Sequence, residues 1–271
     1  MNAPEHPYAG KGIFATWIGA APPRRKPADP DVVGRRAAAA GIEWIAGLVT
    51  WRELRGSKMA TRSIVGTLGN AARVLATHGI RLIPWAYVVP GADHAEEAAR
   101  LLEENAAACV SAWPCPWYEQ APAILDLEWE WNGRSDAEVD ELADALEARG
   151  LEGCVSSYGA PWSFPRLPWA AFAERFAWAM PQAYDGGERS EGPDYPARSV
   201  AAYADHFAEG RIVPLSRAYT AQSGAHYDRR ELVALAKRTP TPAGGLGWWS
   251  LGSMTPGRWA GIGDVEIPGR S

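Results

Sequence analysis

Three carboxylates stand two residues apart near the middle of the chain, at Asp126, Glu128 and Glu130. They lie in a stretch of strand length, residues 123–131, which opens with an apolar run. Successive side chains of a strand point to opposite faces, so the spacing predicts that the three acids share one face and Trp129 lies on the other. Neighbouring carboxylates push their pKa values apart, leaving one protonated while its partner stays charged. The pattern predicts an acid–base pair; the alternative is a strand end with solvated glutamates.

The composition argues against several other kinds of function. A chain of 271 residues with a net charge of −5 has no electrostatic basis for binding nucleic acid. It has no run of 18 apolar residues, so we expect no membrane contact. Its start lacks a basic region followed by an apolar one, which predicts synthesis in the cytoplasm without a signal peptide. The three cysteines and five histidines show no ligand spacing, and we predict no metal and no cofactor.

Strand-like and helix-like segments alternate along the whole chain. Ser135 and Glu138, for example, form a capping-box pattern at the start of a helix that ends at Gly150. A helix is also expected from about Thr61 to His78, and the chain after the last strand is expected to be a loop. Eight strands are predicted, at residues 12–18, 42–51, 81–88, 123–131, 153–158, 177–184, 211–219 and 245–254.

This alternation predicts an α/β fold, a (β/α)8 TIM barrel that forms a single domain over residues 1–271. A doubly wound sheet is the alternative architecture. It is disfavoured because no glycine-rich phosphate loop follows the first predicted strand.

The active site of such a barrel lies at the carboxyl ends of its strands. Aromatic and polar residues gather at these predicted ends, namely Trp85, Tyr87, Tyr158, Gln182, Tyr184, Asp185, Trp248 and Trp249. Each tryptophan alone fits core packing equally well, but a ring of aromatics around acids is suited to sugars. Flat rings stack on the apolar faces of sugars, and paired carboxylates hydrolyse glycosidic bonds. We therefore predict a polysaccharide substrate, bound by these eight residues.

The strand before the acids resembles a known family. Residues 122–128 are similar to the Pro-x-x-Leu-Asp-x-Glu strand of glycoside hydrolase family 25, the barrel lysozymes of bacteria and phages. This resemblance implies that Glu128 is the general acid and Asp126 its charged partner. The chain departs from the family at its first strand, since residues 12–18 contain no acid where family 25 carries an aspartate.

A second resemblance competes with the first. Residues 126–131 are similar to the Asp-x-Asp-Trp-Glu-Tyr motif of family 18 chitinases, which implies that Glu130 is the acid. Residues 180–185 and 244–250 resemble the sixth and eighth strands of that family. There the tyrosine and aspartate, here Tyr184 and Asp185, hold an acetamido group that acts as the nucleophile. Family 18 has an aspartate where this chain has Glu128.

Together these features predict a glycosidase that cleaves β-1,4 bonds in an N-acetylhexosamine glycan, with peptidoglycan as the favoured substrate. The protein is expected to be a lysozyme- or endolysin-like monomer that reaches the cell wall after lysis or within a particle. One alternative is an inactive barrel that serves as a glycan-binding or structural module. Another is a hydrolase whose acids hold Mg²⁺ or Ca²⁺. The strand spacing does not decide between retention and inversion of the anomeric configuration.

Overall fold

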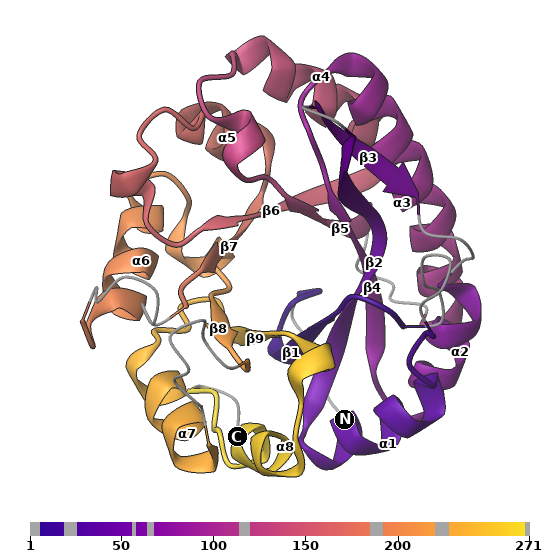
Figure 1. The fold of residues 1–271 in the computed structure, drawn as a ribbon, viewed down its shortest axis with the longest axis vertical. Helices are drawn as coiled ribbons and strands as arrows, with labels where there is room; N and C mark the ends of the chain where they lie inside the picture. Colours follow the sequence, from indigo (N-terminus) through magenta and orange to yellow (C-terminus); the bar gives the residue numbers. More distant parts are fainter. Residues whose placement is uncertain are drawn as a thin grey trace.

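The computed structural model describes residues 6–18, 26–55, 58–63, 68–113, 120–184, 192–219 and 228–268. Eight parallel strands follow one another around a ring in the order β7-β6-β5-β4-β2-β1-β9-β8 (Figure 1). They are β1 (Gly10–Ala15), β2 (Ile42–Arg55), β4 (Arg81–Tyr87), β5 (Ala121–Asp126), β6 (Leu151–Tyr158), β7 (Trp178–Gln182), β8 (Leu215–Arg217) and β9 (Gly245–Trp249).

The two ends of this sheet meet just before β8. Ala179 of β7 forms a parallel bridge with Ile212, and the backbone N–H of Val213 donates to Ala179 O at 2.9 Å. The ring is therefore nearly closed, and the prediction of a (β/α)8 barrel is confirmed.

Helices surround the ring on its outside (Figure 1). The described α-helices are α1 (Pro30–Ala39), α2 (Gly69–Thr77), α3 (Ala92–Ala112), α4 (Asp136–Glu147), α5 (Trp169–Arg175), α6 (Tyr195–Ala204), α7 (Arg229–Arg238) and α8 (Pro256–Gly263). The predicted capping box of Ser135 and Glu138 is present at the start of α4. Among the residues that the structure describes, no helix is both long and apolar enough to cross a membrane.

Two local predictions are wrong. Residues 58–63 form β3 (Lys58–Ser63), which pairs antiparallel with the outer half of β2, so the helix expected from Thr61 begins only at Gly69. Residues 58–63 pair with residues 50–55, which closely precede them in the chain, and this pairing overrides the start of the helical pattern. The segment after β9 contains α8, whose cap Thr255 accepts a hydrogen bond from the backbone N–H of Arg258. The Thr255–Pro256 pair is a helix-start signal that the loop prediction overlooked.

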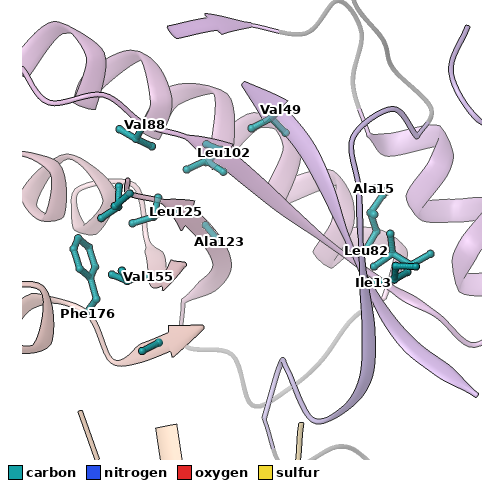
Figure 2. Packing of buried hydrophobic residues seen from close by; sticks show 14 of the residues in the cluster. Ile13, Ala15, Val49, Leu82, Val88, Leu102, Ala123, Leu125, Val155 and Phe176 are labelled. Carbon is teal, nitrogen blue, oxygen red and sulfur yellow. The ribbon is translucent and has the colours of Figure 1, made fainter. Parts of the chain in front are cut away.

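Side chains alternate between two buried layers along the strands, as a barrel requires. The inner layer fills the barrel and includes Tyr8, Phe14, Trp44, Ile83, Trp85, Ile124, Trp178, Met180 and Leu215. The outer layer packs between strands and helices. Figure 2 shows part of it, including Ile13, Val49, Leu82, Leu125 and Val155 from the strands and Leu102 from α3. Both faces of the strands are thus buried, and the positions at their carboxyl ends are left for function.

Candidate active site

The three acids do not share a strand, which corrects the prediction from their spacing. β5 ends at Asp126, and Glu130 lies in a single 3-10 turn, η1 (Trp129–Trp131). The cause is a contact between distant parts of the chain. Trp131 is buried and its indole N–H donates to the backbone oxygen of Val88 at 2.8 Å, which draws the chain across the end of β4.

Gln182 joins the first two acids. Its side-chain nitrogen donates a hydrogen bond to Asp126 Oδ1 at 3.0 Å and another to Glu128 Oε1 at 3.1 Å. An amide NH2 carries two hydrogens, so it serves both carboxyl groups at once. Asp126 is 6% exposed and Gln182 is also buried, whereas Glu128 is half-buried. The structure thus brings together Asp126, Glu128 and Gln182 at the carboxyl ends of β5 and β7.

Glu130 has a different partner. The hydroxyl of Tyr87, at the end of β4, donates a hydrogen bond to Glu130 Oε2. Tyr87 is paired with Asp126 in the register of β4 and β5, so Glu130 lies on the β4 side of the acids. The two glutamates therefore have different hydrogen-bond donors. Glu128 accepts from the Gln182 amide that also serves Asp126, and Glu130 accepts from the Tyr87 phenol.

Tyr184 lies just beyond β7 and close to the acids. Burial raises the pKa of its phenol well above the usual value, and the charges of Asp126 and Glu128 act in the same direction. Its ring meets that of Tyr219 edge to face, with 6.0 Å between centroids. The Tyr184 hydroxyl is protonated at neutral pH, as any phenol with a pKa of 10 or more is, and it is available as a hydrogen-bond donor.

Aromatic rings lie below the acids in the inner layer. Trp85 and Trp249 meet edge to face at 5.4 Å, and Phe14 lies 5.6 Å from each of them. Trp249 is partly buried and belongs to this inner cluster. These rings form an apolar floor in which Phe14 and Trp85 are buried, at 1% and 3% exposed, so Trp249 is the ring of the three that is accessible for stacking on the flat face of a sugar.

Three predicted site residues stand apart from this group. Trp248 is 0% exposed and packs in the outer layer, because side chains of a strand alternate and its neighbour Trp249 points inward. Tyr158 turns its ring onto Phe164, with parallel rings 4.0 Å apart. Asp185 lies outside the described residues.

Arg217 lies at the carboxyl end of a strand, where the sequence also placed it together with Tyr219. It ends β8, is 1% exposed, and its guanidinium carbon lies 5.5 Å from the centre of the Tyr219 ring. Leu215, two residues earlier, belongs to the inner layer, so Arg217 also faces inward. An arginine at a strand end is the signal that identifies it. Within the described segments, no group of three or more His, Cys, Asp or Glu side chains is arranged to hold a metal ion.

No family model and no curated protein sequence matches this chain. Solved structures do. A GH18 chitinase from Pseudoalteromonas aurantia is 15% identical, with 93% of this chain and 97% of that one covered and a TM-score of 0.59. The Bacillus cereus spore cortex-lytic enzyme SleL is 11% identical, with coverage of 96% and 75% and a TM-score of 0.57.

A third solved structure, a xylanase-A-amylase inhibitor protein, is 10% identical, with coverage of 94% and 97% and a TM-score of 0.60. At these identities the likeness to all three establishes the barrel fold alone. One of them belongs to family 18, the second of the two families whose motifs this sequence resembles, and none of the three is a family 25 lysozyme.

Proposed function

We propose that this protein is a glycoside hydrolase that cleaves β-linked bonds in an N-acetylhexosamine glycan. The observation that carries this proposal is the Gln182 amide between Asp126 and Glu128, at the carboxyl ends of the strands and above an aromatic floor. Barrel enzymes carry their chemistry at this end, and glycosidases use two neighbouring carboxyl groups. The fold shared with the Pseudoalteromonas chitinase supports the same chemistry.

Glu128 is the proposed general acid and Asp126 its charged partner. The half-buried Glu128 is the more accessible of the two and donates a proton to the glycosidic oxygen as the bond breaks. The two acid oxygens that share the Gln182 nitrogen lie at most about 6 Å apart, which is close enough for the two carboxyl groups to act on one glycosidic bond.

Tyr184 is the proposed partner of the sugar acetamido group. Its protonated phenol lies near the two acids and is able to donate a hydrogen bond to a carbonyl oxygen. An acetamido oxygen held in this way is placed to act as the nucleophile, while Asp126 stabilises the positive charge that develops on the group. Asp185, the neighbouring residue of the sequence motif, is proposed to assist in the same step.

Peptidoglycan is the substrate we favour, with cleavage at β-1,4 bonds as in a lysozyme or endolysin. The fold shared with the spore cortex-lytic enzyme SleL supports a cell-wall glycan, and the first sequence resemblance points the same way. Chitin, the substrate type of the family 18 resemblance, is the alternative glycan.

A second candidate function is glycan or protein binding without catalysis. The structural similarity to a xylanase-A-amylase inhibitor protein favours it, since that protein's name describes inhibition and not hydrolysis. The absence of an acid from β1 (Gly10–Ala15) is in line with this candidate.

The decisive experiment compares the wild type with Glu128→Gln and Glu130→Gln on purified bacterial cell walls and on chitin oligosaccharides. We expect the wild type to clear walls or shorten oligosaccharides, and Glu128→Gln to be inactive while still folded. A wild type that binds either glycan without cleaving it supports the binding candidate. Activity that survives both substitutions contradicts the site assignment.

A further inference from the structure

Three large apolar residues of the described chain are exposed: Val32 on α1 at 36%, Trp129 at 59% and Trp162 at 38%. The two tryptophans follow β5 and β6, at the same end of the barrel as Asp126 and Glu128. Trp129 comes directly after Glu128 in the chain. An exposed indole is costly in water, so two beside one site call for an explanation.

Phe164 connects Trp129 to the barrel. The rings of Trp129 and Phe164 meet edge to face, with 6.5 Å between centroids. Phe164 is stacked in turn on Tyr158, at the end of β6. The backbone N–H of Gly133 donates to Arg166 O at 2.7 Å, which ties the loop after β5 to the loop after β6. Trp129 therefore projects from the loop after β5, which is fixed to the loop after β6.

Trp162 is held by contacts on one side. It lies in the 3-10 turn η2 (Pro161–Ser163), and the guanidinium carbon of Arg198 sits 4.5 Å from its ring centre. Tyr195 meets it edge to face at 6.1 Å. These contacts orient the indole and still leave 38% of the residue exposed. A ring fixed in this way loses little further freedom when a ligand stacks on it.

We propose that Trp129, Phe164 and Trp162 form an aromatic shelf that binds additional sugar units of a long glycan chain. The proposal rests on the proposed function, because the shelf is to hold the same chain whose bond lies at Glu128. A glycan is the favoured occupant because flat rings match the apolar faces of pyranoses. The shelf also begins at the residue after the acid, and the guanidinium of Arg198, which lies over the Trp162 ring, is a donor suited to sugar hydroxyls.

The test compares long and short ligands by calorimetry in the catalytically disabled Glu128→Gln background. The probes are the disaccharide and hexasaccharide of β-1,4-linked N-acetylglucosamine, together with sedimentation on purified peptidoglycan. Trp129→Ala and Trp162→Ala are each expected to weaken hexasaccharide binding about tenfold and to leave disaccharide binding unchanged. Trp129→Phe retains a ring and should recover most of the affinity. Val32→Ala removes exposed apolar surface on α1 and should change neither ligand.

Two outcomes overturn the shelf. One is an unchanged ratio of hexasaccharide to disaccharide affinity in both tryptophan variants. The other is a protein that binds neither the hexasaccharide nor peptidoglycan, which leaves the exposed indoles to a protein partner. This test can succeed even if the proposed catalytic function is wrong. If the wild type hydrolyses no glycan but the variants lose hexasaccharide or peptidoglycan binding, the shelf stands and only catalysis falls.

Discussion

The side-chain nitrogen of Gln182 lies 3.0 Å from Asp126 Oδ1, although 56 positions separate the two residues in the sequence. They end β7 and β5, and β6 runs between these strands. The amide therefore reaches past the end of β6, where it meets both members of the proposed acid pair. This contact makes Gln182 a positioning residue for Asp126 and Glu128.

Replacing Gln182 with leucine should lower kcat far more than it changes KM. Leucine has a similar size but donates no hydrogen bond to either acid. Hydrogen bonds to charged groups contribute about 1.5–3 kcal/mol, so a loss of roughly 10- to 100-fold in kcat is expected. Hydrolysis rates over a range of substrate concentrations measure this, and the thermal midpoint checks the fold. An unchanged kcat in a folded variant contradicts the role of the amide.

The contacts of the two glutamates predict unequal losses. Glu128→Gln should reduce kcat by roughly 10²- to 10⁴-fold, the usual contribution of a general acid. Glu130→Gln makes the hydrogen bond from Tyr87 a neutral one and Tyr87→Phe removes it, so each variant should cost less than about tenfold.

The double variant Tyr87→Phe/Glu130→Gln tests that shared origin. It should lose no more activity than the worse single variant, since both changes act on one interaction. If Glu130→Gln is the inactive variant instead, the acid is Glu130 and the family 18 alignment of the motif is the correct one.

The pattern of strands and helices was predictable from sequence because each element carries its own apolar period and its own start and stop signals. The orientation of single residues was harder to predict. A parallel strand is buried on both faces, so nothing local distinguishes Trp248, which faces the helices, from Trp249, which faces the site. The departure of Glu130 from the strand depends on the bond from Trp131 to Val88, a contact between distant parts of the chain.

The candidate site was predictable to a similar extent. The types of residue at the strand ends identified Asp126, Glu128 and Gln182 before any geometry was known. Their bridging contact depends on the relative heights of β5 and β7, which the sequence of either strand alone does not contain. The exposure of Trp129 was hidden by the predicted length of the strand. A strand that continued to residue 131 would give Trp129 no exposed position beside the acids, but β5 ends at Asp126.

The buried Tyr203 and the partly buried Tyr184 should make the fold sensitive to high pH. Burial raises the pKa of both Tyr184 and Tyr203 well above 10. In the unfolded chain both phenols ionise near pH 10, whereas in the folded protein they ionise only at a higher pH. Above pH 10 the unfolded state therefore binds fewer protons than the folded state. The free energy of unfolding should therefore be insensitive to these groups below about pH 9 and fall as the pH rises above about 10.

Denaturant titrations of the wild type and Tyr203→Phe between neutral pH and pH 11 check this expectation. The variant loses the hydrogen bond from Tyr203 to the backbone oxygen of Tyr158, so it should be less stable at neutral pH by about 1 kcal/mol. Between pH 9 and pH 11 the variant should then lose less stability than the wild type. Only one of the two phenols remains in it, so the loss that these phenols cause should be about half as large. Parallel curves for the two proteins would rule out Tyr203 as a source of the alkaline loss.

The buried thiols should be unreactive in the folded protein. Burial raises the pKa of Cys109 to about 12 and that of Cys154 well above 9, and the thiolate is the form that reacts. Cys115 lies outside the described residues, so the Cys115→Ser variant isolates the other two. At pH 8 this variant should show no thiol that reacts rapidly with a disulfide reagent, and two after unfolding. Rapid reaction of the native variant would contradict the burial of Cys109 or Cys154.

Gly12 should tolerate no side chain, because the indole of Trp44 fills the barrel beside it. A Cβ built on Gly12 would lie 2.0 Å from Trp44 Cε2, and that indole is fixed by a hydrogen bond of 3.1 Å to the backbone oxygen of Tyr8. Gly12→Ala should therefore destabilise the fold by about 1–3 kcal/mol or more, the cost of overpacking a core. Gly257→Ala, where nothing lies closer than 4.0 Å, is the matched control and should be neutral or slightly stabilising. Denaturant unfolding measures both, and equal stabilities would mean that the inner layer yields around Trp44 instead of holding it rigidly.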